Sequence, residues 1–501
     1  MFGITAWLRW FWRQLTSMRI ALFLLFLLAL ASVPGSIFPQ RGTAPARVSQ
    51  YLREHPKSGP ILDRLHLFDV FASPWFAAIY LLLFISLAGC VIPRAFEYWR
   101  ELRSEPPTAP RNLSRLGVYE SWRTTTSASD ALAKTAVNWE AKGWRVKVGD
   151  TYVSAEKGYA REFGNLVFHL ALLGLLVAVG AGSSYGFRGT VIVREGTGFA
   201  NNVTQYDSFT PGRSYSATSL PPFSFSLTDF HAKYQSGGMQ SGAAREFHAD
   251  VLVKANPEAR EVKFRIKVNE PLRVAGVTVY LVGHGYSPEF TVRDSKGKIV
   301  WQDAAIFLPQ DANFTSNGVV KAPDSVPQLG FQGYFLPTVT SDFSQGPRSI
   351  FPAPDDPQVF LSAWSGDLGL DSGLPQSVYQ LDTQKMKRIG IEELSPGEKW
   401  KLPRGQGVIE FTGFKQWAAF SLARDPGKGW ALGFAIFAIA GLTMSLLIPR
   451  RRVWLRVAEH AEGGILCEVG GLAKTQAPGL PAEVTRLSLI VKESAPEVLS
   501  D

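Results

Sequence analysis

Apolar residues are distributed unevenly along the chain, in four long runs separated by stretches of mixed polarity. The runs cover residues 18–33, 74–92, 164–182 and 430–448. A helix that rises about 1.5 Å per residue needs about 20 residues to cross a hydrocarbon core of about 30 Å. The pattern therefore predicts four membrane-spanning helices.

The first run is the shortest, and with its basic flank it also resembles a cleavable signal peptide. The stretch before it, "WLRWFWRQ" (Trp7 to Gln14), is aromatic and basic. That composition is typical of a segment that lies at a membrane interface and stays attached. We therefore interpret residues 1–17 as a cytoplasmic, interfacial N-terminus and residues 18–33 as a retained span.

Basic residues orient the spans, because lysine and arginine are enriched in cytoplasmic loops. Arginines gather before the first run, after the second and after the fourth: Arg9, Arg13, Arg19, Arg94, Arg100, Arg103, Arg450, Arg451 and Arg452. Both termini are therefore expected in the cytoplasm, with an outside loop at residues 34–73 and a large outside domain at residues 183–429. This clustering explains the formal net charge of +9 better than a nucleic-acid-binding face does.

The outside segment alternates apolar and polar residues with a period of two, which is typical of half-buried strands. "REFHADVLVKANPEAREVKFRIKVNEPL" predicts two strands around a turn at Asn256-Pro257. "PEFTVRDSKGKIVWQD" predicts a second hairpin that turns at residues 294–297. Helical periodicity is nearly absent, so we expect an all-β domain of about 240 residues built as a sandwich.

Residues 93–163 predict a small cytoplasmic α+β module. A proline-rich linker, "SEPPTAPRN", is followed by a strand, a helix with Asp130 as its N-cap, and two further strands. The cytoplasmic tail, residues 449–501, begins with a predicted hairpin that turns at Gly463-Gly464 and adds strands to the same module. The fold class is thus a polytopic α-helical membrane protein with four spans, a large extracytoplasmic all-β domain and a small cytoplasmic α+β module.

Composition excludes several functions. Only 19% of the residues are charged, below the roughly 25% of soluble domains. The two cysteines, Cys90 and Cys467, form no C-x-x-C pair, which excludes a dithiol oxidoreductase, and both fall on the cytoplasmic side. No C-x-x-C-H or phosphate-binding glycine loop is present, so the chain neither carries covalent haem nor hydrolyses ATP through such a loop.

His169 lies inside the third run, where an ionisable side chain is costly and suggests a function by default. No aspartate, glutamate or lysine occurs in the four runs, so a proton relay is disfavoured. Two interpretations stay open: half of a bis-histidine haem iron site, or a packing histidine that hydrogen-bonds a neighbouring helix. No metal-ligand spacing is present among the outside histidines His55, His66, His231, His248 and His284. His231 and His248 lie in strand-like stretches and are expected to be surface or sheet positions.

The order of these elements resembles the ResB (CcsB) family of the system II cytochrome c biogenesis machinery. The resemblance is carried by "SMRIALFLLFLLALASVPGSIFPQ", "LFDVFASPWFAAIYLLLFISLAGCVIPR", "REFGNLVFHLALLGLLVAVGAG" running into "GFRGTVIVREG", "GWALGFAIFAIAGLTMSLLIPRRRVW", and "GGLA" at Gly470 to Ala473. It extends from about Ser17 to Ala473, nearly the whole chain. Each motif is weak by itself, whereas their order and spacing are specific.

The resemblance implies a bacterial inner-membrane protein that pairs with a ResC (CcsA) partner to move haem out of the cytoplasm. The pair supports the attachment of haem to apocytochrome c outside. In this family the histidine of the third span, His169 here, is an axial ligand of a transiently bound haem b, opposite a histidine of the partner. The partner's Trp-rich segment and outside histidine pair have no counterpart in this chain, so it is expected to be no enzyme on its own but a subunit of a holocytochrome c synthase.

Attachment needs reduced thiols, and this chain has no outside cysteine to supply them, so a separate thiol-reducing system is a further expected partner. The alternative function is a membrane scaffold or chaperone for the partner or the apocytochrome, without direct haem ligation. A stand-alone transporter is disfavoured by the absence of inverted repeats and of acidic residues or lysines in the spans.

Overall fold

The computed structural model describes residues 4–42, 45–340, 346–370, 378–460, 463–473 and 477–498. The first three residues of the predicted N-terminal segment and the last three of the predicted tail lie outside the described residues. The chain divides into two compact units. One comprises Met1–Gly182 and Gly427–Asp501, and the other is Ser183–Pro426, called the β-domain below.

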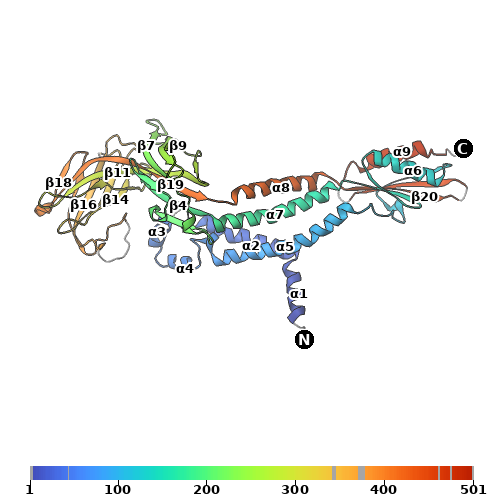
Figure 1. Cartoon of the computed structure of the whole chain (residues 1–501), viewed down its shortest axis with the longest axis horizontal. Helices are drawn as coiled ribbons and strands as arrows, with labels where there is room; N and C mark the ends of the chain where they lie inside the picture. The colour runs from blue at the N-terminus through green and yellow to red at the C-terminus, as the bar shows by residue number, and fades with distance from the viewer. Residues whose placement is uncertain are drawn as a thin grey trace. The chain divides into compact units, whose positions relative to one another are not determined.

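Four helices of the described chain are long and apolar enough to cross a membrane: α2 (Met18–Ile37), α5 (Pro74–Arg103), α7 (Ala160–Tyr185) and α8 (Lys428–Leu447) (Figure 1). They coincide with the four predicted runs. The second is longer than predicted, because α5 continues past Ile92 and through Pro93 to Arg103. Proline lacks a backbone N–H, so the helical hydrogen bond at position 93 is missing.

Short helices surround the first two spans. Helix α1 (Ile4–Leu15) precedes α2 and exposes Trp7, Trp10 and Trp12. Between α2 and α5 lie α3 (Pro45–Glu54), α4 (Gly59–Arg64) and the 3-10 turn η1 (Val70–Ala72).

A five-stranded antiparallel sheet in the order β1-β21-β20-β3-β2 forms the module of the first unit. Its elements are β1 (Val118–Thr124), α6 (Ala128–Ala141), β2 (Arg145–Val148), β3 (Tyr152–Lys157), β20 (Arg451–Glu459), β21 (Ile465–Ala473) and α9 (Leu480–Ser494). The predicted tail hairpin thus supplies the central strand, β20, and its neighbour β21. Gly463 and Gly464, at its turn, both have positive φ, which glycine adopts without strain.

The two faces of this sheet are covered differently. Trp139 of α6 and Val484 of α9 join the apolar core on one face. On the other face, Ser154 Oγ and Trp454 Nε1 donate to the carbonyl oxygen of Pro107, at 2.7 and 3.2 Å. The proline-rich segment that the sequence predicts to be a linker therefore packs against the sheet.

The predicted N-cap of α6 was wrong. The cap is Ser127, whose Oγ accepts a hydrogen bond from the Asp130 amide at 3.2 Å. The helix begins at Ala128, so Asp130 lies in its first turn, where a carboxylate interacts favourably with the helix dipole. The sequence also gave no expectation for α9, whose buried residues recur at helical spacing.

The β-domain contains three sheets. A seven-stranded sheet follows the path β10-β11-β19-β4-β6, with β12 and β18 added at its side. Its strands are β4 (Phe187–Arg194), β6 (Ser208–Pro211), β10 (Leu272–Val274), β11 (Val277–Arg293), β12 (Ile299–Ala304), β18 (Lys399–Lys401) and β19 (Val408–Arg424). A four-stranded sheet contains β5 (Gly198–Ala200), β7 (Ser224–Tyr234), β8 (Ala244–Lys254) and β9 (Val262–Lys267). A five-stranded sheet contains β13 (Leu308–Pro309), β14 (Ser316–Ala322), β15 (Leu329–Leu336), β16 (Gln358–Gly366) and β17 (Met386–Leu394).

Both predicted hairpins are confirmed. Strand β8 pairs with β9, and β11 pairs with β12. In the second turn, Asp294 Oδ1 accepts from the amides of Lys296 and Lys298 at 2.8 and 2.9 Å. An aspartate that bonds the backbone two residues on is a common way to close such a turn.

The expectation of one sandwich was too simple, because the β-domain has two apolar cores. The first includes Phe225 and Phe420, between the four-stranded sheet and one part of the seven-stranded sheet. The second includes Phe331 and Phe411, between the five-stranded sheet and the other part. Strands β11 and β19 have 17 residues each, about 55 Å at strand rise, so each is long enough to serve both cores.

Candidate functional site

His169 lies ten residues into α7, and its ring geometry fixes where its lone pair is. The Nδ1 atom is 2.8 Å from the carbonyl oxygen of Asn165, one turn earlier. A carbonyl oxygen only accepts hydrogen bonds, so Nδ1 must carry the hydrogen. In the neutral imidazole the lone pair is therefore on Nε2.

The Nε2 atom has no hydrogen-bond partner in the part of the chain that the structure describes. The ring is half-buried and meets Phe168 edge to face, with 5.1 Å between ring centroids. Histidine ligands of metals typically donate their second ring N–H to a carbonyl or carboxylate, which fixes the tautomer. The Asn165 carbonyl provides that second contact, so the geometry meets one requirement of metal ligation.

Helix α8 holds one side of α7 by close backbone approach (Figure 1). A Cβ atom at Gly441 would lie 2.6 Å from the carbonyl oxygen of Gly164, closer than real Cβ contacts allow. A Cβ atom at Gly174 would lie 2.4 Å from the ring of Phe434. Small residues at such positions let membrane helices pack tightly through van der Waals contact.

Helix α5 contacts a different side of α7, through Tyr80. The Tyr80 hydroxyl donates a hydrogen bond to the carbonyl oxygen of Leu176 and lies close to Gly180. His169 precedes Gly180 by eleven residues, which brings the two positions to within about 20° around the helix axis. His169 is therefore on the side of α7 that faces α5.

A buried ion-pair cluster holds the N-terminal end of α7. Arg450, three residues past α8, is 4% exposed, and Glu156 of β3 is 1% exposed. The Nε atom of Arg450 is 2.5 Å from Glu156, and its Nη1 is 3.2 Å from Glu101 and 3.3 Å from Glu162. One guanidinium thus joins the end of α5, the start of α7 and the module.

The buried pair of Glu156 and Arg450 stays ionised. Burial alone would raise the pKa of Glu156, but hydrogen bonds from Arg450, Tyr159 and Arg452 lower it below its ordinary value. Burial alone would lower the pKa of Arg450, but its carboxylate partners raise it. The guanidinium also lies over the Tyr159 ring, 5.0 Å from the centroid, a cation–π arrangement.

The sequence did not reveal two of these contacts. Arg450 was interpreted only as one of the arginines that set topology, and nothing in its spacing signalled three carboxylate partners. The Tyr80 contact was missed because the residue lies near the start of its apolar run, where tyrosine is common for interfacial reasons. The 11-residue interval between His169 and Gly180 could have placed both on one helix face, but it could not name the neighbouring helix.

The histidines that the sequence predicts to lie outside the membrane form no common site in the described residues. His231 and His248 face each other across β7 and β8 with 5.0 Å between ring centroids, and His284 is buried among aromatic rings of the β-domain. His55 stacks on Tyr51 at 4.2 Å. In the described ranges, no group of three or more histidines, cysteines or carboxylates could hold a metal ion.

Comparison with known proteins identifies the family. The sequence profile of the ResB-like family matches residues 18–485. The chain belongs to the ResB-like family. It is 24% identical to the cytochrome c biogenesis protein CcsB of Prochlorococcus marinus (strain NATL1A), over 94% of this chain and 96% of that protein.

Two further relatives match at similar length. The cytochrome c biogenesis protein CcsB of Synechococcus sp. (strain WH7803) is 27% identical, over 94% of this chain and 96% of the relative. The cytochrome c biogenesis protein CcsB of Prochlorococcus marinus (strain AS9601) is 28% identical, over 96% of this chain and 97% of the relative. The resemblance expected from the order of the four runs is thus confirmed at the level of family.

Proposed function

We propose that this ResB-like protein is a membrane subunit of a cytochrome c biogenesis system. Together with a ResC/CcsA-type partner it carries haem across the membrane and supports its covalent attachment to apocytochrome c. Support comes from the family match over most of the chain and from relatives that are named cytochrome c biogenesis proteins. Those relatives align along nearly their whole length, so the proposal concerns the whole chain.

The topology we propose places both termini and the five-stranded module in the cytoplasm and the β-domain outside the bacterial inner membrane. Four apolar helices and the arginines that flank them support this orientation. The β-domain would then support the attachment site or hold the apocytochrome. Neither of the two cysteines lies in the β-domain, so a separate system would keep the apocytochrome thiols reduced.

We propose that His169 is an axial ligand of the transported haem b. The observation that carries this is the Nδ1 to Asn165 carbonyl contact of 2.8 Å, which leaves the Nε2 lone pair available to iron. The site offers one ligand from this chain, and the second axial ligand would come from a histidine of the partner. The subunit therefore contributes binding and position, not a complete catalytic site.

The test is a visible absorption spectrum of the full chain co-purified with its partner, compared for wild type, His169→Ala and Leu170→Ala. Leu170 is an exposed neighbour on the same helix, so its variant controls for truncation of an α7 side chain. We expect His169→Ala to lose or shift the Soret band and to lose cytochrome c assembly in cells. Added imidazole should restore the band, because it can occupy the vacated ligand position.

The scaffold alternative gives a different outcome. If His169→Ala retained the wild-type spectrum and assembled cytochrome c as well as the Leu170→Ala control, His169 would be a packing residue. The chain would then support its partner without touching iron.

A further inference from the structure

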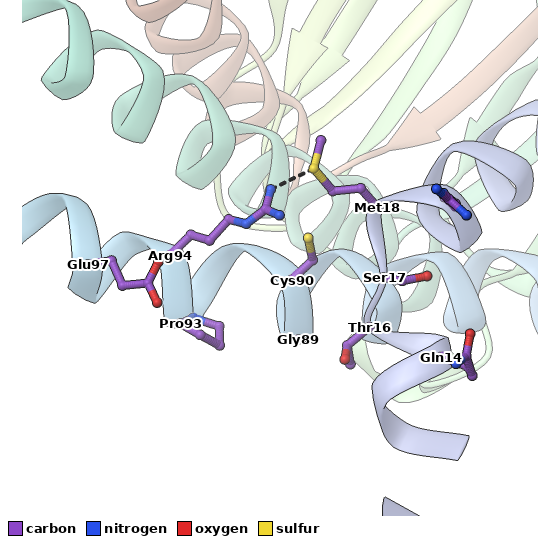
Figure 2. Close-up of a pocket in the computed structure, with 10 residues that line it drawn as sticks. Gln14, Thr16, Ser17, Met18, Gly89, Cys90, Pro93, Arg94 and Glu97 are labelled. Atoms are coloured by element: carbon purple, nitrogen blue, oxygen red, sulfur yellow. Dashed lines mark hydrogen bonds between the residues drawn. The ribbon is translucent and has the colours of Figure 1, made fainter. Parts of the chain in front are cut away.

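A cavity lies beside α5 at the turn between α1 and α2, with a volume of about 710 Å³ (Figure 2). Met18, Cys90 and Arg94 are among the residues that line it. Figure 2 shows the Arg94 and Met18 side chains extending toward one another on the same side of α5 as Cys90. The cavity therefore places the Arg94 cation beside soft, weakly polar groups, and Arg19 and Glu97 also line it.

Arg94 lies on the side of α5 that faces α7. It follows Tyr80, whose hydroxyl contacts α7, by fourteen residues, which places it within about 40° of Tyr80 around the helix axis. The two helices are antiparallel, because Tyr80 near the start of α5 meets Leu176 near the end of α7. At the other end, Arg450 joins Glu101 of α5 to Glu162 of α7.

The helical rise places Arg94 relative to His169. The Tyr80 hydroxyl meets α7 between Leu176 and Gly180, about nine residues after His169. From this contact, Arg94 is about 21 Å along α5, and His169 is about 14 Å back along α7, at 1.5 Å per residue. Along the helix axes, Arg94 is thus about 7 Å closer than His169 to the N-terminal end of α7. The offset is comparable to the distance from the centre of a haem macrocycle to the carboxylates on its propionate edge.

The charge of Arg94 is not neutralised by a carboxylate in the described part of the chain. Its Nη1 is 2.6 Å from Sδ of Met18, and a thioether sulfur is only a weak acceptor. Glu97, one turn further along α5, lines the same cavity but forms no ion pair with Arg94 among the described residues. A guanidinium in this setting favours a carboxylate from outside the chain, because its planar fork matches a carboxylate in a bidentate contact.

We infer that Arg94 binds a propionate carboxylate of the haem that His169 ligates, an inference that rests on the proposed function. The carboxylate displaces the Met18 sulfur from the guanidinium. The contact orients the macrocycle in the span, with its propionate edge toward the side from which haem is taken up. Haem that lacks ionised propionates should therefore lose this orienting contact but keep its iron ligand.

The experiment compares protohaem with its dimethyl ester, whose propionates carry no charge. The full chain with its partner is depleted of haem and titrated with each compound, and binding is followed at the Soret band. We expect wild type to bind protohaem at least about tenfold more tightly than the ester, the range for a hydrogen bond to a charged group. Arg94→Gln should weaken protohaem binding by a similar factor and leave ester binding unchanged, whereas Arg94→Lys should keep part of the preference.

The matched control is Arg100→Gln, which removes a cation from the same helix outside the cavity lining. It should keep the wild-type preference for protohaem. If Arg94→Gln weakened the binding of protohaem and of the ester equally, Arg94 would have a structural role. If Arg94→Gln kept the wild-type preference for protohaem over the ester, the proposed contact with a propionate carboxylate would be refuted. If Arg94 instead binds a lipid phosphate, Arg94→Gln will release co-purifying anionic lipid without changing the preference.

The His169→Ala spectrum is read separately from this titration. An unchanged Soret band position in His169→Ala would refute iron ligation by His169, whatever the behaviour of Arg94. An unchanged preference for protohaem in Arg94→Gln, with a shifted band in His169→Ala, would overturn only the Arg94 assignment.

Discussion

His284 lies on β11, and replacing it with phenylalanine would remove an imidazole that must stay neutral in the folded protein. The side chain is 8% exposed, with its ring 4.8 Å from that of Phe230, 4.7 Å from Phe247 and 4.6 Å from Phe314. Its Nε2 atom is 3.0 Å from the Tyr234 hydroxyl. Its Nδ1 atom is buried with no hydrogen-bond partner among the described residues, so a second N–H would point at apolar rings.

Burial lowers the pKa of His284 from 6.5 to about 4. The folded state thus binds the proton more weakly than the unfolded state, so stability is fully present above pH 6.5 and falls as the pH drops toward 4. At about 1.4 kcal/mol for each unit of pKa shift, the loss is about 2 kcal/mol at pH 5 and about 3 kcal/mol at pH 4.

The assay is urea denaturation of the full-length protein in detergent, followed by tryptophan fluorescence from pH 7.5 to 4 for wild type and His284→Phe. Other titrating groups act in both proteins, so the difference between the two unfolding free energies isolates His284. Between pH 7.5 and pH 4, the unfolding free energy of wild type should fall by about 3 kcal/mol more than that of His284→Phe. The matched control is His231→Phe, which makes the same change at an exposed position of the same domain. Parallel curves for wild type and His284→Phe would refute the reasoning.

Two further predictions concern the first unit. Gly441→Leu should prevent the contact between α7 and α8 and cost about 1–3 kcal/mol or more, because its Cβ would lie 2.6 Å from the Gly164 carbonyl. Size-exclusion chromatography should show less monodisperse protein than for Gly433→Leu, whose Cβ would meet nothing within 4 Å. Arg450→Leu should destabilise the protein by about 3–5 kcal/mol in urea-dependent proteolysis, because it removes one partner of the buried ion pair with Glu156. Adding Glu162→Gln to Arg450→Leu should recover part of that loss. If the changes in unfolding free energy of the two single variants simply added in the double variant, Arg450 and Glu162 would not interact.

Local patterns predicted those elements whose stability is itself local. The four apolar runs identify α2, α5, α7 and α8, because a helix that meets lipid on most sides must be apolar along its whole length. The turn residues Asp294 to Gly297 mark the β11–β12 hairpin, because an Asx turn needs only one side chain and its own backbone. His169 stood out for the same reason, as a polar residue within a local apolar pattern.

Features that depend on distant segments were not predictable. The partners of Arg450 lie on β3, α5 and α7, and an arginine after a span has the same sequence pattern whether it faces water or three carboxylates. The two cores of the β-domain depend on which sheets cover β11, a choice that alternation alone does not determine. The burial of His284 likewise comes from rings on β7, β8 and the segment before β14.

The proposal that His169 ligates haem iron also predicts a second chain, because of where the histidines of this one lie. The sequence has seven, and His169 is the only one within the four apolar helices. In the proposed site a six-coordinate haem iron would need two axial ligands, and His169 would supply one of them. We therefore expect the second ligand to come from another polypeptide, either a partner with its own intramembrane histidine or a second copy of this chain. Tyr80 and α8 hold α7 on two sides, so the approach of that ligand is restricted to the surface that they leave open around His169.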